Sequence, residues 1–162
     1  MSFRHLFVGR HPRRTAARVA VLAALAFVTF RWVLVPVRTE GISMQPTYES
    51  GRYIFANKLA YFTKPPARGD VVAIRLARGR AFYVKRIVGL PGERLAIVSG
   101  QVEIDGTPLD EPYVRHRRPW DVGEMTLGPR EYFVVGDNRG MNAADHDFGR
   151  VDRDRIVGKI LF

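Results

Sequence analysis

A chain of 162 residues has room for one domain and a short tail, and its hydrophobic fraction of 46% fits a folded core rather than a disordered chain. The sequence contains no cysteine, which excludes disulfide bonds, thiolate catalysis and thiolate metal sites. The formal net charge of +10 is high, and its distribution along the chain limits what it can mean.

The positive charge is concentrated at the N-terminus. Seven arginines and no Asp or Glu precede Glu40, so the rest of the chain is only mildly basic. A nucleic-acid-binding domain would carry its basic residues on a folded face, beside polar or aromatic side chains. A short basic run further on, residues 115–118, is typical of a solvated loop. We therefore expect no nucleic-acid partner.

Residues 16–37 are predicted to form a transmembrane helix. The stretch is almost wholly apolar and supplies the roughly 20 residues that a bilayer core requires. Arg31 interrupts it near one end, where a long side chain can extend to the headgroups, and Trp32 suits the interface. Five arginines lie at its N-terminal end, which by the positive-inside rule places residues 1–15 in the cytoplasm and residues 38–162 outside it.

Other interpretations of this stretch remain open. A cleaved signal peptide would be followed by a small-residue cleavage site, whereas Pro-Val-Arg-Thr-Glu, residues 36–40, follows here. A buried helix of a soluble protein is also compatible, because the uninterrupted apolar run, residues 19–30, is short. The same run has no polar face, which disfavours a helix lying flat on the membrane surface.

Beyond Glu40 the sequence changes to short β-type runs separated by turn signals. The hairpin pattern at residues 102–109 has Asp105-Gly106 at its tip. The predicted fold class is therefore mainly β, an antiparallel β-sheet domain preceded by one N-terminal transmembrane helix. The predicted strands are residues 52–57, 71–76, 81–90, 94–98, 101–104, 131–135 and 156–162.

Ser43 lies shortly after the predicted span, in the segment Gly-Ile-Ser-Met-Gln-Pro-Thr at residues 41–47. A serine hydroxyl becomes a good nucleophile only when a base takes its proton. Gly41 would permit close backbone approach, Pro46 would stiffen the exit, and the Ser43 N–H could face a developing oxyanion. The structural alternative is a turn serine before a proline.

Lys85 interrupts a strand that is otherwise largely apolar. In strand alternation Tyr83, Lys85 and Ile87 share one face, and Arg86 lies on the other. With one basic residue on each face, at least one of them lies on a covered or cleft-lining face. A desolvated lysine loses its proton more easily and can serve as a general base. The alternative is an edge-strand lysine that deters aggregation.

A polar loop, residues 136–149, follows the apolar strand predicted at 131–135. Asp137 and Arg139 are expected to pair and to fix this loop. His146 lies between two aspartates, but neighbours on a strand point in opposite directions, so a solvated loop histidine is favoured over a metal ligand. We expect no metal and no cofactor.

Together these segments resemble type I signal peptidases, the membrane-anchored Ser-Lys leader peptidases. Ser-Met-Gln-Pro-Thr, residues 43–47, is similar to the family's nucleophile box, and Arg-Gly-Asp-Val-Val, residues 68–72, to a strand start. Lys-Arg-Ile-Val-Gly-Leu-Pro-Gly, residues 85–92, matches the lysine box, and Gly-Asp-Asn-Arg, residues 136–139, matches the last box. The four boxes stand in the family's order after one predicted span.

The resemblance implies a membrane-bound serine endopeptidase that removes N-terminal signal peptides from exported preproteins. Ser43 would be the nucleophile and Lys85 the general base, with the substrate bound as an extended strand and small side chains near the cut. It also implies a single-pass protein of the bacterial inner (plasma) membrane, a monomer, whose extracytoplasmic catalytic domain rests on the lipid bilayer. The supporting residues carried over are Gly41, Met44, Pro46, Tyr83, Asp137, Arg139, Asn142 and Asp145.

The chain departs from the family's pattern in two places. Gly41 stands where the family often has a Ser or Thr that acts as side-chain oxyanion donor. Counted without gaps along the last box, Asn142 takes the position of a serine that hydrogen-bonds the catalytic lysine, and Ala144 that of an aspartate. A shift of one residue gives Asp145 the aspartate role. Asn142 can still accept a hydrogen bond from Lys85, and the sequence leaves open whether it does.

Three other functions compete with signal peptide cleavage. One is a dedicated maturation peptidase of the same family, similar to the members that process a pilin in conjugal transfer. Another is a catalytically inactive membrane-bound module that holds extended peptides. A cytosolic self-cleaving repressor with the related Ser-Lys fold would need a DNA-binding helical domain, for which the first 40 residues leave no room.

Overall fold

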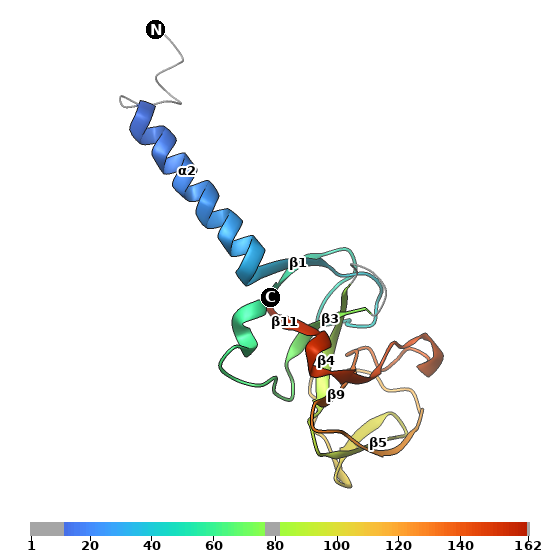
Figure 1. The fold of residues 1–162 in the computed structure, drawn as a ribbon. Helices are drawn as coiled ribbons and strands as arrows, with labels where there is room; N and C mark the ends of the chain where they lie inside the picture. The colour runs from blue at the N-terminus through green and yellow to red at the C-terminus, as the bar shows by residue number, and fades with distance from the viewer. Residues whose placement is uncertain (1–11, 77–81, 162) are drawn as a thin grey trace.

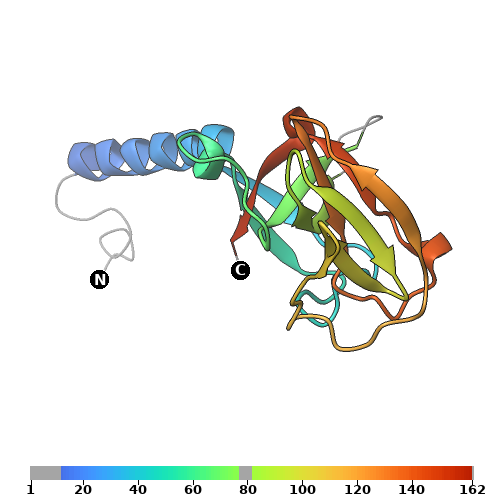
Figure 2. The ribbon, with the colours of Figure 1, turned by 90° about the horizontal axis from the view of Figure 1, so that it is seen from below.

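The N-terminal apolar segment forms one long helix that projects from a β-rich body (Figures 1 and 2). The computed structural model describes residues 12–76 and 82–161. Helix α2, Pro12–Val28, continues into a π-helical turn, η1, Thr29–Val33, and together they are long and apolar enough to cross a membrane. The side chains along it are exposed, with Leu22 and Phe27 each keeping 65% of their surface.

The helix ends at Val33, before the predicted end of the span at Val37. The chain then forms strand β1, Leu34–Arg38, which pairs antiparallel with β2, Tyr53–Asn57. Pro36 explains part of this difference, because proline has no N–H to continue a helix and is tolerated in an edge strand. Strand β1 lies at one edge of its sheet.

The main sheet has seven strands, in the order β1-β2-β11-β3-β4-β9-β10, and every neighbouring pair is antiparallel. Short 3-10 helices, η2 at Lys58–Tyr61, η3 at Ala143–Asp145 and η4 at Arg153–Arg155, lie in the connections. The remaining strands of this sheet are β3, Val71–Arg75; β4, Phe82–Gly89; β9, Glu131–Val135; β10, Gly149–Asp152; and β11, Ile156–Leu161.

A second, four-stranded sheet has the order β7-β6-β5-β8 and is also antiparallel. Its strands are β5, Arg94–Val98; β6, Gln101–Ile104; β7, Thr107–Pro108; and β8, Val122–Thr126. It is built from the segment between β4 and β9 and lies at the end of the body away from the helix (Figure 1).

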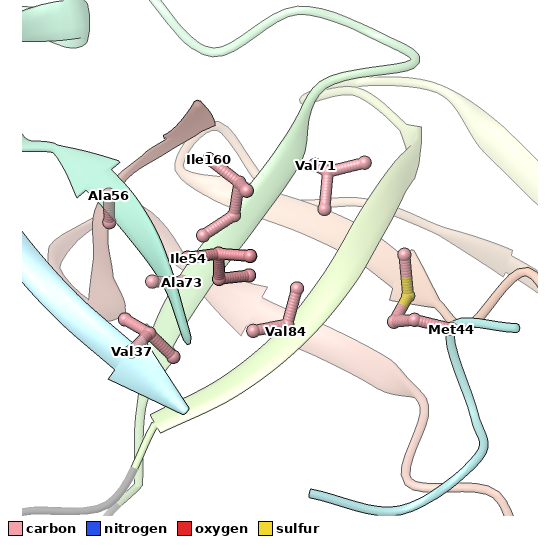
Figure 3. Close-up of a cluster of buried hydrophobic side chains, with 8 residues drawn as sticks. All are labelled: Val37, Met44, Ile54, Ala56, Val71, Ala73, Val84 and Ile160. Carbon is pink, nitrogen blue, oxygen red and sulfur yellow. The ribbon is translucent and has the colours of Figure 1, made fainter. Parts of the chain in front are cut away.

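The central strands of the main sheet are buried on both faces. In β3, Val71 and Ala73 belong to one cluster of buried apolar side chains, while Val72 and Ile74 belong to another. The first cluster also contains Met44 from the loop that carries Ser43 (Figure 3). Continuous apolar runs such as this one are typical of strands covered on both sides.

The predicted fold class, mainly antiparallel β with one N-terminal apolar helix, is confirmed. Each predicted strand contains an observed strand, and residues 102–109 form the predicted hairpin as β6 and β7. Ala81 and Phe162, the ends of two predicted strands, lie outside the described residues. Strands β1, β8 and β10 were not predicted, because the first continues an apolar helix and the other two are short and half exposed.

Candidate active site

Ser43 lies in the loop between β1 and β2, and Thr39 closes this loop at its base. The Thr39 N–H donates to the Arg52 carbonyl (2.8 Å), and the Thr39 hydroxyl accepts the Arg52 N–H (3.0 Å). Gly41 has a φ of +82°, a left-handed conformation that favours glycine. Met44 is buried in the core. The segment is therefore held on both sides of Ser43.

Lys85 reaches Ser43 from strand β4. Its Nζ lies 2.9 Å from Ser43 Oγ, and only 3% of the residue is exposed. Pairing with Val72 in β3 fixes the backbone of Lys85. Tyr83, expected to share its face, has its ring centroid 5.8 Å from Nζ. The two residues singled out in the sequence are thus brought into contact.

The surroundings of Lys85 favour its neutral form. Burial lowers the pKa of Lys85 from its ordinary 10.5, and the Asp147 carboxylate opposes this with a smaller effect. A neutral amine has a lone pair that can accept the proton of Ser43, whereas an ammonium has none. The pair can therefore supply a nucleophile and its base in direct contact.

The last box, residues 136–139, makes hydrogen bonds to the backbone of the Ser43 loop. The Asn138 N–H donates to the Ser43 carbonyl (2.9 Å), and the Asn138 side-chain amide donates to the Ile42 carbonyl (3.1 Å). Gly136 makes this approach possible, because a Cβ there would lie 2.2 Å from the Ser43 carbonyl oxygen. The backbone of the box therefore sets the position of the nucleophile.

Asp137 and Arg139 are both buried, but they do not pair with one another as expected. The Asp137 carboxylate accepts hydrogen bonds from Arg86 (2.8 and 2.7 Å) and from the Thr47 hydroxyl (2.5 Å). Arg139 pairs with Glu111, and both of these side chains are fully buried. Asp137 and Arg139 each bind side chains from distant segments. The prediction that they pair with one another is therefore wrong.

The sequence left open whether Asn142 accepts a hydrogen bond from Lys85, and the Asn142 amide binds other residues. Its Oδ1 accepts from Arg118 (2.7 Å), and its Nδ2 donates to Asp145 (3.1 Å). Asn142 is exposed just before η3, where Arg118 offers a charged donor. The peptide bond that joins Gln45 to Pro46, shortly after Ser43, is cis.

His146 is buried, with 6% exposed, and the expectation of a solvated loop histidine is wrong. Its Nε2 lies 2.6 Å from the Asn138 carbonyl oxygen. Its ring packs against Trp120, with centroids 6.0 Å apart, and against Phe148, at 6.3 Å. Phe148 lies two residues further along the same loop, but Trp120 comes from a distant segment, so the local sequence alone does not indicate the burial.

An open cleft of about 550 Å³ contains the Ser43–Lys85 pair. Residues 36–44 form one wall and residues 82–85 the other, and Met141, Asp145 and Asp147 also line it. Both polar and apolar groups face the space. Among the described residues, no group of three or more His, Asp or Glu side chains is arranged to hold a metal ion.

One edge of β4 is open where it borders this cleft. The register of β4 with β9 runs from Arg86 to Gly89, whereas Phe82 to Lys85 are paired with β3 alone within the described strands. An open strand edge presents backbone N–H and C=O groups that can bind an extended peptide. The cleft therefore combines the Ser43 hydroxyl, the buried Lys85 amine and a strand edge that is unpaired within the described strands.

Several residues around the site were assigned no function from the sequence. Arg86, Thr47 and Asn138 lie inside the quoted boxes. The motifs therefore included these residues but did not indicate which groups they bind. Glu111 and Asp147 had no local signal, because only the fold brings them to the site. The Arg-Gly-Asp box is structural: the Arg68 guanidinium donates to the Val88 carbonyl and pairs with Glu93, behind β4.

A serine hydroxyl in contact with a buried lysine, beside an open strand edge, forms a site suited to polypeptide hydrolysis. Residues 13–162 match the family model described as signal peptidase, peptidase S26, so the chain belongs to that family. At family level it is a peptidase that removes signal peptides.

Two sequence relatives agree with this assignment, and one solved structure is also similar. A signal peptidase I from Bacillus caldolyticus is 36% identical over 158 residues, covering 89% of this chain and 84% of the relative. A signal peptidase IB from Staphylococcus aureus is 29% identical over 162 residues, with the same coverage. A crystal structure of a signal peptidase I from Enterococcus faecalis V583 has a TM-score of 0.49 and 27% identity, covering 60% of this chain and 98% of that one.

Proposed function

We propose that this chain is a membrane-anchored endopeptidase that cuts signal peptides from exported preproteins with Ser43 as nucleophile and Lys85 as general base. The observation that carries the proposal is the 2.9 Å contact between Lys85 Nζ and Ser43 Oγ inside the cleft. The burial of Lys85 supports it, because a base must be unprotonated before it can act.

The reaction follows from these two groups. Lys85 takes the hydroxyl proton as Ser43 Oγ attacks the scissile carbonyl carbon, and a tetrahedral oxyanion forms. The intermediate collapses, the C–N bond breaks, and Lys85 gives the proton to the leaving amine. Water then attacks the Ser43 ester with Lys85 again as base, which releases the signal peptide with a free carboxylate and restores both side chains.

The substrate binds as an extended strand along the open edge of Phe82 to Lys85. Backbone hydrogen bonds along that edge supply affinity without reading side chains, as in other β-strand additions. Selection then depends on the walls of the cleft, where Met44 and Val84 leave room for small side chains near the cut. Alanine on the acyl side of the scissile bond is the preferred residue.

The apolar N-terminal helix supports a position of the cleft near the membrane surface. Near its end, Phe62 is 85% exposed and Leu59 is also exposed, beside a hydrogen bond from Lys58 Nζ to the Arg31 carbonyl (2.7 Å). Exposed aromatic and apolar side chains next to a lysine suit the bilayer interface. We place the N-terminus in the cytoplasm and the catalytic domain outside the bacterial inner membrane, as a monomer on the lipid surface.

A cleavage assay tests the proposal. The full chain in detergent is incubated with a preprotein that carries Ala-x-Ala before its cut, and product is quantified for wild type, Ser43→Ala and Lys85→Ala. Both variants are expected to lose activity, while the exposed controls Ser50→Ala and Lys64→Ala retain it. Cleavage that survives both site substitutions overturns the Ser-Lys assignment.

Two further arms separate the alternatives. A peptide-binding module without activity would bind the preprotein in wild type and leave it intact. A dedicated maturation peptidase would cut a pilin precursor and leave general preproteins uncut. Protease treatment of spheroplasts tests topology: the proposed orientation exposes the β domain, and a protected β domain contradicts it.

A further inference from the structure

His146 lies directly beneath the backbone that holds the nucleophile. Its Nε2 is 2.6 Å from the Asn138 carbonyl oxygen, and because a carbonyl only accepts hydrogen bonds, Nε2 carries the ring proton. The other ring nitrogen, Nδ1, is buried and has no hydrogen-bond partner among the described residues. A second proton on this ring would therefore have no acceptor.

The hydrogen bond from His146 continues to Ser43 through a single residue. Asn138 accepts at its carbonyl from His146, donates its N–H to the Ser43 carbonyl (2.9 Å) and donates its side-chain amide to the Ile42 carbonyl (3.1 Å). The contact is tight as well as polar: a Cβ on Gly136 would lie 3.0 Å from His146 Cε1 and 2.2 Å from the Ser43 carbonyl oxygen. The ring, the Gly136 backbone and the Ser43 backbone are thus packed in one layer.

We infer that His146 is a positioning residue that sets Ser43 against Lys85 through Asn138, and that it does so only as a neutral imidazole. The inference rests on the proposed role of Ser43 and Lys85, and it adds a residue to which the sequence analysis assigned a solvated loop position. A shift of the nucleophile by about 1 Å can cost about 100-fold in rate, so a residue that fixes its backbone affects turnover without touching substrate.

The charges around the ring oppose a second proton. Burial lowers the pKa of His146 below its ordinary 6.5, and Lys85 from β4 and Arg139 from the loop after β9 lower it further. The Asn138 carbonyl and the neighbouring Asp147 act in the other direction, with Asn138 the stronger of the two. Trp120 and Phe148 cover the ring and offer it no carboxylate.

Lowering the pH then affects two groups at the site, Lys85 and His146. Protonation of Lys85 removes the base. Protonation of His146 places a charged ring in an aromatic pocket without an acceptor for Nδ1, so the ring leaves its place and the Asn138 carbonyl loses its donor. The rate should accordingly depend on two protons at low pH, one from each residue, rather than on one.

Substitutions at position 146 separate the hydrogen bond from the charge. His146→Gln places an amide nitrogen near the position of Nε2 and cannot titrate, whereas the amide of His146→Asn matches Nδ1 and falls short of Asn138. In the detergent assay at pH 8, His146→Asn is expected to lower kcat by about 10- to 100-fold with KM within about threefold. His146→Gln is expected to restore most of that loss, and the exposed His116→Gln serves as control.

The pH profile is the decisive readout. In wild type, log(kcat/KM) should fall with a slope of one proton below the pKa of Lys85 and of two protons below the pKa of His146. His146→Gln should retain a slope of one throughout, and His116→Gln should follow wild type. A slope of two in His146→Gln, or equal kcat in His146→Asn and wild type, overturns the inference.

A measurement independent of turnover separates this inference from the proposed function. In Ser43→Ala, which cannot react, NMR titration of the His146 ring should give a pKa below 6.5. If the His146 variants behave as wild type while Lys85→Ala is inactive, the positioning role fails and the Ser-Lys function stands. If Lys85→Ala remains active, the proposed function itself fails.

Discussion

Arg86 and Asp137 are joined by two hydrogen bonds, from Arg86 Nε (2.8 Å) and from a terminal guanidinium nitrogen (2.7 Å), directly behind the Ser43–Lys85 pair. Strand alternation explains the geometry: Lys85 points to Ser43, and Arg86, the next residue, points to the other face. Asp137 also accepts the Thr47 hydroxyl (2.5 Å). The Asp137 carboxylate, in the last box, thus connects strand β4 to the loop that carries Ser43.

Asp137→Asn should weaken both fold and activity. The Asp137 side chain is fully buried and that of Arg86 nearly so, and removing one partner of a buried pair costs on the order of 3 kcal/mol. Chemical denaturation in detergent should show a fall of about this size in the free energy of unfolding. The exposed pair Arg130–Asp154 supplies the control, since Asp154→Asn should change stability by less than about 1 kcal/mol. Equal effects of the two substitutions would contradict the assigned role of Asp137.

The pH dependence of activity should respond to Asp147. Lys85 must be neutral to act, so activity should rise with pH through a pKa below 10.5. The Asp147 carboxylate raises the pKa of Lys85, and Asp147→Asn should therefore move the rising limb of the profile to lower pH. Asp145→Asn is the matched control, because Asp145 lines the same cleft without acting on the pKa of Lys85. A shift in the control and none in Asp147→Asn would refute the electrostatic argument.

Replacing Lys85 should abolish activity but increase the stability of the fold. The folded-state pKa of Lys85 is depressed, so its contribution to stability is complete above 10.5 and is lost as pH falls toward the folded-state value. Lys85→Met removes this loss and should raise both the unfolding free energy and the melting temperature at pH 7. The gain should shrink as pH approaches 10.5. A variant that is less stable than wild type at neutral pH would show that Lys85 is not held neutral by burial.

The sequence predicted this site better than its surroundings. Ser43, Lys85 and the last box were found because each motif is local, and the strands were found from short β-type runs bounded by turn residues. Strand β8 was missed because Gly123 interrupts a half-exposed run that has no alternation to detect. The partner of Arg139 could not be predicted, since Glu111 lies 28 positions away on a loop and a neighbouring aspartate offered a simpler pair.

For both His146 and Asn142, the contacts of the side chain could not be predicted from the sequence. His146 is buried because Trp120 and Phe148 meet over it, and packing between distant segments leaves no periodic signal in the sequence. Asn142 occupies the predicted position along the chain, but Arg118 from another loop takes its carbonyl oxygen. Motif order therefore fixes which residues lie near the cleft, while hydrogen-bond partners depend on the tertiary structure.

Gly41 offers a direct test of the oxyanion site. No side chain at this position can donate to an oxyanion, and the Thr39 hydroxyl is already engaged with the loop backbone. A Cβ at position 41 would meet no atom within 4 Å, although the φ of +82° costs about 1 kcal/mol of strain for a residue with a side chain. Gly41→Ala carries the same strain without a hydroxyl, so the ratio of the two variants isolates the donor.

We expect Gly41→Ser to exceed Gly41→Ala in kcat by at least about tenfold, because an oxyanion donor is worth roughly 3 kcal/mol of barrier. Both variants should unfold at a lower temperature than wild type by a similar amount. Equal kcat in the two variants would mean that a side chain at position 41 does not reach the oxyanion.

Gly136→Ala tests whether the backbone of the last box sets the position of Ser43. The added Cβ would lie 2.2 Å from the Ser43 carbonyl oxygen, so the two segments must move apart and the Asn138 hydrogen bond must lengthen. Overpacking of this kind costs about 1–3 kcal/mol, and the displaced nucleophile should lower kcat by about 100-fold. Gly123→Ala in β8 is the control, because its Cβ would meet nothing within 4 Å and its backbone needs no glycine. Thermal unfolding and the cleavage assay on both variants check this, and full activity in Gly136→Ala would show that the nucleophile loop is positioned by other contacts.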